Sequence, residues 1–400
     1  MKFLRYIQKK RRTMLALAAL TIFSNPFNVH ASNITTKDGT TINPTNNVYN
    51  IEVQKKLSSS VGVNKFTNFD LDSGHIANMQ FDKLQTLANL VDNRININGT
   101  VNALRDGKIG GNLYFLSPNG IAVGSTGVIN AGAFTGMAVD ESYFDKLGGI
   151  TSAGEFMTAL APKNIVYNND PDKGIDIQGV INAPGGIHLY ATKIDIGQDA
   201  ILRTDVSEID FKKVVNVEGV DSGITSGLDA SYKDGDIVLK AYAEHTADDN
   251  VIKNISGDTA SQWEKVTERK ATINVDGTIK SAGDVSINAE FVTTFSEGSY
   301  FNVISQTGAV DAFLGSLGLD LAVDFAKKDN TATVNIGKTA DIYSAGDMDI
   351  SATGNLKVTI NATTPAAKLG TTSATDWVPA ISVAVISATN KAAVNVDGKL

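Results

Sequence analysis

A segment that returns at a nearly fixed interval in the last third of the chain constrains the fold more than any other feature. Ala271–Gly277, "ATINVDG", returns as Ala332–Gly337, "ATVNIG", and as Ala392–Gly398, "AAVNVDG". A second segment, Ser281–Ala289, returns in the same order as Ser344–Ala352. A constant period, here about 60 residues, built from strands and turns is typical of a solenoid, in which each unit packs on its neighbours.

Most of the chain after residue 90 alternates apolar and polar residues in short runs. Arg94–Gly99, Gly186–Ala191 and Lys193–Gly197 show this pattern. Such runs are typical of short strands whose alternate side chains point to opposite faces. We therefore predict an all-β fold, a right-handed parallel β-helix with an N-terminal capping region, few short helices and about 20 residues per coil.

The same alternation predicts the core of the solenoid. Ile273, Val275, Ile279, Val285 and Ile287 fall at inward positions, where they would stack on the equivalent residues of the next coil. The alternative all-β fold is a string of β-sandwich domains. That class usually has longer strands and a heavier aromatic core than this chain, of which only 7% is aromatic.

Two segments depart from the alternation and predict helices. Gln80–Asp92 has apolar residues at helical spacing, and Glu141–Leu147 shows a similar pattern. The apolar residues of the first segment are Phe81, Leu84, Leu87, Leu90 and Val91.

Residues 1–31 have the pattern of a secretory signal peptide. Six basic residues precede the apolar run Met14–Phe23, and Val29-His30-Ala31 predicts cleavage between Ala31 and Ser32. The alternative is a membrane anchor, but an apolar run of about ten residues is too short to span a bilayer. We therefore expect the Sec machinery to export the chain.

Composition excludes some functions and limits others. The chain has no cysteine, so its stability outside the cytoplasm must come from the hydrogen-bonded core. After residue 31 it carries 29 basic and 43 acidic residues, a net charge of −14. Because an acidic surface repels phosphates, we expect no nucleic-acid partner.

One stretch, Asn112–Gly136, combines an apolar strand with a stiff turn. Leu113–Leu116 leads into Ser117-Pro118-Asn119-Gly120-Ile121, and the coil Gly127–Gly132 follows. Pro118 fixes its own φ, and Asn and Gly accept left-handed conformations, so these residues predict a preset tight turn. The turn can be a stable corner of the fold, a contact for a partner protein, or both.

These residues resemble the secretion domain of two-partner-secretion exoproteins of the filamentous-haemagglutinin type. Upstream, Asn64–Phe69 is similar to the family's segment with two phenylalanines three residues apart, and Arg94–Ala103, "RININGTVNA", is similar to the coil before the turn. Ser117 stands where the family has Asn, and Ala77-Asn78-Met79 stands in place of an earlier Asn-Pro-Asn-Leu motif. The chain is most similar to the leukotoxin-type filamentous adhesins of anaerobic Gram-negative bacteria.

The resemblance implies a function and its partners. It implies the N-terminal part of a large filamentous adhesin or exoprotein, exported by an outer-membrane transporter of the TpsB type and placed outside a Gram-negative cell, where it contacts a host-cell receptor. We expect residues 1–31 to be the signal peptide, 32–245 the secretion domain with its cap, and 246–400 the repeats of about 60 residues, which would continue in a longer protein. The alternatives are the passenger of a classical autotransporter and a polysaccharide-acting β-helix enzyme.

Residues that could carry chemistry are scattered, and we predict no catalytic site, no cofactor and no metal. His75, His188 and His245 lack metal-ligand spacing. A β-helix enzyme would need carboxylates converging on one groove, and the candidate clusters are Asp170/Asp172, Asp234/Asp236 and Asp248/Asp249. Asn168–Asp172 is rich enough in oxygen ligands for calcium, although an ordinary polar loop explains it as well.

Overall fold

The computed structural model describes residues 32–37, 39–206, 227–245, 267–297, 320–360 and 380–400. Strands dominate these residues, and α2 (Glu141–Gly149) and α3 (Ala153–Ala159) are their two α-helices. Residues 1–31, the predicted signal peptide, lie outside the described part.

Three parallel ladders run side by side along the molecule, and we call them faces A, B and C. Face A contains β5 (Val61–Leu71), β7 (Thr86–Val91), β11 (Asn112–Ser117), β14 (Ala133–Ala138), β17 (Ile187–Ala191), β20 (Ile237–His245), β23 (Val285–Glu297) and β26 (Met348–Ile360). Face B contains the end of β5, β8 (Ile95–Ile97), β12 (Ile121–Val123), β15 (Ile175–Ile177), β18 (Lys193–Ile196), β21 (Thr267–Val275), β24 (Asp320–Ile336) and β27 (Ala380–Val396). Face C contains β3 (Val48–Ile51), β6 (Ile76–Asp82), β9 (Thr100–Arg105), β13 (Val128–Asn130), β16 (Val180–Asn182), β19 (Ile201–Arg203), β22 (Thr278–Ser281) and β25 (Asp341–Ser344).

The chain crosses faces A, B and C in turn and then starts the next coil, so the prediction of a mostly β, parallel β-helix-like architecture is confirmed. The repeated sequence segments lie directly on one another, because Ala271 pairs with Ala332 and Ala332 with Ala392. One sequence repeat is therefore one coil. The prediction of about 20 residues per coil holds only in the N-terminal part, where Ile175 pairs with Ile194 of the next coil.

The core runs through the inside of all the coils. One cluster of buried apolar residues extends from Ile51 to Ile342 without a break at the predicted boundary after residue 245. Each of the five predicted inward residues exposes at most 1% of its surface. These residues are Ile273, Val275, Ile279, Val285 and Ile287. Stacked aliphatic side chains thus fill the interior, as the alternation predicts.

The N-terminal end departs from parallel pairing. β1 (Asn33–Thr36) and β4 (Lys55–Lys56) both pair antiparallel with β5, and β2 (Ile42–Thr45) pairs antiparallel with β3. β10 (Lys108–Ile109) adds a short antiparallel pair to β9. Antiparallel strands at this end cover hydrogen-bonding groups that a bare first coil would expose.

A helical insertion between β14 and β15 covers the outer side of face A. α2 confirms the helix predicted at Glu141–Leu147, and its N-cap Asp140 accepts hydrogen bonds from two backbone N–H groups. α3 begins at the N-cap Ser152, and two 3₁₀ turns follow, η1 (Pro162–Asn164) and η2 (Pro171–Lys173). Helix residues such as Phe144 and Phe156 pack with outward residues of face A in a second apolar cluster.

The helix predicted at Gln80–Asp92 is wrong, because this segment forms the end of β6, a corner at Asp82 and strand β7. All six residues of β7 are buried. Leu87 and Val91 face the solenoid core, whereas Ala88 and Leu90 face the helical insertion. A strand that is covered on both faces loses its alternation, and the apolar residues then fall at helical spacing by coincidence.

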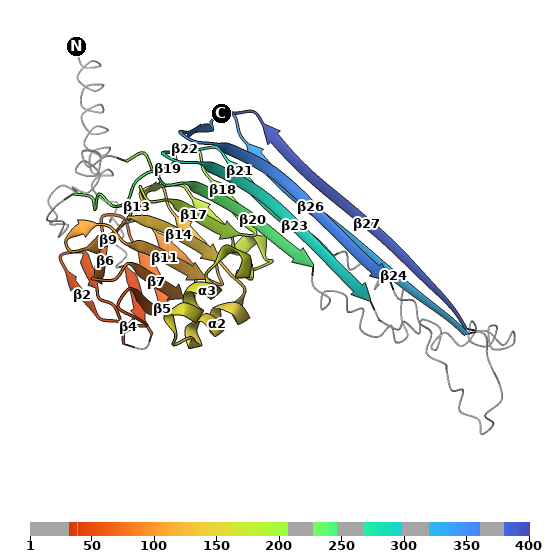
Figure 1. Cartoon of the computed structure of the whole chain (residues 1–400), viewed down its shortest axis with the longest axis horizontal. Coiled ribbons are helices and arrows are strands. Elements are labelled where there is room, and N and C mark those ends of the chain that lie inside the picture. Colours follow the sequence, from red (N-terminus) through yellow and green to blue (C-terminus); the bar gives the residue numbers. More distant parts are fainter. Residues whose placement is uncertain (1–31, 38, 207–226, 246–266, 298–319, 361–379) are drawn as a thin grey trace, which may run out of the picture.

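The last coils have much longer strands on faces A and B. β20 and β21 have 9 residues each, while β24 and β27 have 17 each. Figure 1 shows these strands running side by side and projecting as an arm beyond the rounded N-terminal part. The helical insertion and the arm both arise between faces A and B, so this corner of the solenoid accepts insertions.

A row of buried asparagines runs along face C. Asn78, Asn102, Asn130 and Asn182 are at least 99% buried, and each donates from Nδ2 to the Oδ1 of the asparagine one coil earlier at 2.9–3.1 Å. The first acceptor is Asn50. Because each amide donates to the next one, the row stays hydrogen-bonded although it is shielded from water.

Candidate functional site

The turn Ser117–Ile121 forms the corner between β11 of face A and β12 of face B. Ser117 Oγ donates to Asn93 O and accepts from Asn119 N, both at 2.9 Å, while Asn119 Nδ2 donates to Asp92 O at 2.8 Å. Ile95 N donates to Gly120 O at 3.0 Å. The turn is therefore held on the corresponding corner of the coil below it.

The end of the helical insertion covers the turn from the other side. Asn168 Nδ2 donates to Pro118 O at 2.6 Å, and Ile121 N donates to Gly174 O at 3.1 Å. Ser117, Pro118, Gly120 and Ile121 are buried, and Asn119 is half-buried. In the folded protein, Asn119 is the one residue of the turn with an appreciable exposed surface.

Gly120 is the residue of the turn that tolerates least change. Its φ is +88°, a conformation that glycine adopts without strain. A Cβ at this position would lie 2.5 Å from Gly174 O and 2.8 Å from Lys173 O. The turn and the segment that covers it thus meet at the backbone, with no space for a side chain.

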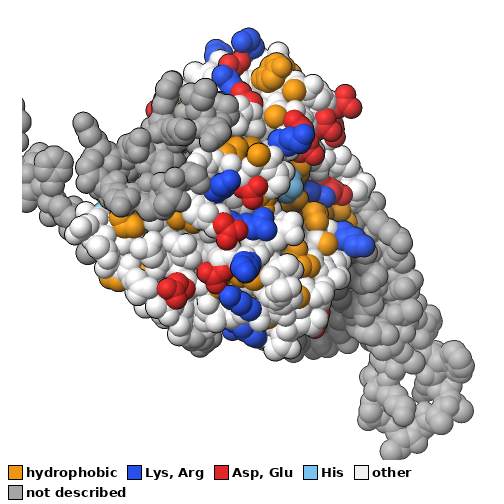
Figure 2. Space-filling view, turned by 60° about the vertical axis from the view of Figure 1, so that its left-hand side comes forward, with side chains coloured by type: hydrophobic (Ala, Val, Ile, Leu, Met, Phe, Trp, Pro, Cys, Tyr) orange, Lys and Arg blue, Asp and Glu red, His pale blue; other side chains and the backbone are white. Residues whose placement is uncertain are grey.

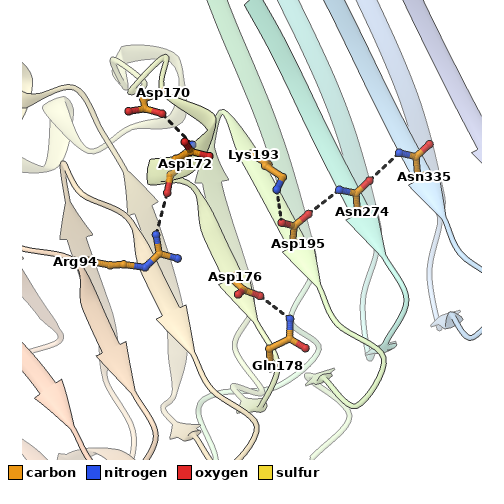
Figure 3. Close-up of polar contacts among 9 residues, drawn as sticks. All are labelled: Arg94, Asp170, Asp172, Asp176, Gln178, Lys193, Asp195, Asn274 and Asn335. Carbon is orange, nitrogen blue, oxygen red and sulfur yellow. Dashed lines mark hydrogen bonds and ion pairs between the residues drawn. The ribbon is translucent and has the colours of Figure 1, made fainter.

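The residues that cover the turn were not predicted to do so. Asn168 is distant from the turn in the sequence, and we interpreted its loop as a possible calcium site. In the structure its neighbours use their oxygens locally, since Asp170 N binds Asn168 Oδ1 at 2.9 Å and Asp172 N binds Asp170 Oδ1 at 3.0 Å. Arg94 Nη1 donates to Asp172 O at 3.0 Å and ties the loop to the coil below (Figure 3). No group of acids and histidines in the described ranges could hold a metal ion.

The outer side of face B carries a second polar ladder, drawn in Figure 3. Asn274 Nδ2 donates to Asp195 Oδ1 at 2.6 Å, and Asn335 Nδ2 donates to Asn274 Oδ1 at 2.7 Å. Lys193 Nζ pairs with Asp195 Oδ2 at 2.8 Å. These side chains satisfy one another along the stack, which indicates a structural role.

The predicted histidine and carboxylate candidates lie apart. His75 is in the turn after β5 and His188 is on β17, while His245 ends β20. Asp170/Asp172 precede face B, whereas Asp234/Asp236 precede face A at another corner, and Asp236 Oδ1 accepts from Asp284 N at 2.8 Å. Asp248/Asp249 lie outside the described residues. The two described clusters do not share a groove.

A small cavity of about 200 Å³ lies between the N-terminal strands and α2. Lys37, Lys65, Asp92 and Asp145 are among its lining residues, and Lys37 pairs with Asp92 at 2.9 Å. Figure 2 shows acidic and basic side chains interspersed among the described residues of one face. In the view of these residues, neither sign of charge forms a separate patch.

Tyrosines in the second apolar cluster predict a loss of stability at high pH. Burial raises the pKa of Tyr143 to about 12, and burial followed by the neighbouring Tyr114 raises the pKa of Tyr190 to about 12. The unfolded chain loses these protons near pH 10, so between pH 10 and 12 the folded state binds more protons than the unfolded one. Stability then falls as pH rises through this window, by up to about 1.4 kcal/mol per pH unit for each tyrosine.

Urea unfolding between pH 9 and 12 measures this slope. Tyr190→Phe should make the slope shallower, because it removes one of the tyrosines whose pKa burial raises, while Tyr343→Phe at an exposed position serves as the control. Equal slopes for the wild type and Tyr190→Phe would contradict the assignment.

Comparisons with known protein families and with curated proteins identified no relative of this chain. Across the described residues, no helix is both long enough and apolar enough to cross a membrane.

Proposed function

We propose that this chain is the N-terminal part of a large secreted filamentous adhesin or exoprotein, exported by an outer-membrane two-partner-secretion transporter. The observation that carries the proposal is the position of Ser117–Ile121. The segment that resembles the family's secretion motif is a corner enclosed between the coil below and residues 168–174 above. We also propose that the parallel coil is right-handed, since crossovers between parallel strands almost always are.

Burial of the turn supports recognition before folding is complete. While the chain is unfolded, Pro118 and Asn119 are accessible to a transporter at the membrane. Once residues 168–174 pack over the turn, four of its five residues are buried. The same turn then acts first as a recognition signal for the transporter and later as a corner of the fold.

The N-terminal end of the solenoid supports growth in one direction. Antiparallel strands cover this end, and the later coils pair parallel with one another. A chain that emerges with its N-terminus first could complete this end and then add coils one after another, each templated by the last. Such folding outside the cell would favour continued export and give a long rigid fibre suited to adhesion.

A secretion assay tests the proposal. Residues 1–400 are produced in a Gram-negative host with and without the candidate transporter. A Pro118→Ala/Asn119→Ala variant is compared with Pro162→Ala/Asn164→Ala, which changes the same residue types at exposed positions in η1. We expect release into the medium only with the transporter, a loss of release for the first variant, and normal release for the second.

Two outcomes would count against the proposal. Equal release of both variants would leave the turn as a structural corner alone. Retention of the folded protein in the periplasm with every transporter tried would favour the autotransporter passenger, in which the export pore belongs to the same polypeptide.

A further inference from the structure

Ser32, the first described residue, is held by its side chain against the turn that follows β5. Ser32 Oγ lies 2.5 Å from His75 Nδ1 and accepts a hydrogen bond from Asp72 N at 2.9 Å. His75 is 95% buried, and its Nδ1 is also 3.4 Å from Tyr49 OH. A serine at this position is thus fixed by the buried His75 and by the backbone of Asp72, whereas the start of an ordinary tail is free to move.

The backbone register places the nitrogen of Ser32 beside Asp72. β1 runs antiparallel to β5 with Asn33 opposite Asp70. Continuing this register by one residue puts Ser32 opposite Leu71, which directly precedes Asp72. Since neighbouring strands are about 5 Å apart, a group on the Ser32 nitrogen lies within reach of the Asp72 side chain.

Asp72 carries an oxygen that has no hydrogen-bond partner among the described residues. Its Oδ2 is buried and accepts no hydrogen bond from any described residue. A carboxylate oxygen withdrawn from water in this way is costly unless a donor satisfies it. The most effective donor would carry a positive charge, because hydrogen bonds to charged groups are the strongest.

We propose that Ser32 is the N-terminal residue of the mature protein and that its α-ammonium group binds the Asp72 carboxylate. This inference rests on the proposed export, in which hydrolysis of the Ala31–Ser32 bond leaves a carboxyl group on Ala31 and an amine on Ser32. The amine takes a proton from water at neutral pH, since free α-amino groups have pKa values of about 7.7–8.0. Before cleavage the same nitrogen belongs to an uncharged peptide bond.

Signal removal would therefore lock the first strand of the solenoid. The ion pair forms at the start of β1, and β1 in turn pairs along β5, the first strand of face A. An uncleaved chain can make the Ser32 hydroxyl contacts but not the ion pair. The N-terminal end thus becomes fully stable only after processing.

Two forms of the protein that differ by one residue test this inference. Residues 32–400 are released from a cleavable fusion so that one form begins at Ser32 and the other has one glycine before Ser32. The added glycine keeps an α-ammonium group but moves it by about 3.5 Å. Asp72→Asn is made in both forms, and hydrogen exchange is measured at the amides of residues 61–76, with residues 271–289 as an internal control.

We expect exchange in 61–76 to be about tenfold slower in the form that begins at Ser32, as a charged hydrogen bond there requires. Asp72→Asn should abolish that difference, and exchange in 271–289 should be the same in all four proteins. Equal exchange in the two wild-type forms, or a difference that persists in Asp72→Asn, would overturn the proposal.

The N-terminus of the exported protein separates this proposal from the one on which it rests. Mass spectrometry of the protein recovered from cells should find Ser32 as the first residue, and another start would overturn the proposal for the natural protein. Failure of the candidate transporter to release the chain would instead count against two-partner export, and would leave the contrast between the two forms unaffected.

Discussion

Gly120→Ala should destabilise the corner between faces A and B by about 3 kcal/mol. Two costs add at this position. An alanine at φ +88° is strained, and its Cβ would lie 2.5 Å from Gly174 O, which is backbone and cannot move aside without displacing the segment over the turn. The effect is read from hydrogen exchange of the Ile95 and Ile121 amides, which donate to Gly120 O and Gly174 O.

Gly39→Ala is the matched control for this variant. Gly39 has nearly the same φ, +89°, but a Cβ there meets nothing within 4 Å. It should cost only the backbone strain, about 1 kcal/mol. If the two variants lose the same free energy of unfolding, the close contact with Gly174 does not contribute to the loss. In the secretion assay, Gly120→Ala should also reduce release more than Gly39→Ala does.

Asn102→Ala should destabilise the protein by about 3 kcal/mol, because it interrupts the buried asparagine row in its middle. The change removes the hydrogen bond from Asn130 Nδ2 to Asn102 Oδ1 at 2.9 Å and the one from Asn102 Nδ2 to Asn78 Oδ1 at 3.1 Å. Asn78 and Asn130 are at least 99% buried, so water does not readily replace these two bonds. Exchange of the amides in β9 and β13 measures the loss.

Asn335→Ala supplies the comparison for the buried row. Asn335 also lies between two asparagines, donating to Asn274 and accepting from Asn395 at 2.7 Å each, but its row lies on the outer side of face B. Water can satisfy the two neighbours there, so the cost should be about 0.5 kcal/mol or less. If the two variants lower the free energy of unfolding equally, burial adds nothing to the stability of the face C row.

Periodicity predicts much of this fold, and it fails where the environment is unusual. The inward residues of the repeat and the helix at Glu141–Leu147 follow directly from spacing, because each has one buried and one exposed side. Gln80–Asp92 does not, since β7 is covered by the core on one side and by the helical insertion on the other. That insertion begins only after β14, two coils later in the chain, and no pattern within β7 indicates it.

Of the candidate site, only the turn itself could be predicted from the sequence, and the residues that pack against it could not. Ser117-Pro118-Asn119-Gly120 indicates a tight turn from the preferences of four neighbouring residues. The carbonyls of Asp92 and Asn93 below the turn, and Asn168 and Gly174 above it, are long-range partners. Sequence spacing does not predict such contacts, because they depend on the order in which the coils stack. The Asp72–Ser32 contact is of the same kind.

The unequal strand lengths have a mechanical consequence. Ladder hydrogen bonds point along the stack, so a pull between its two ends would load every bond of a given coil junction at once. β12 and β15 meet over three residues each, whereas β24 and β27 meet over 17. Under tension the coils would part first among the short strands near the N-terminus, and the long-stranded repeats would stay joined as one unbroken segment.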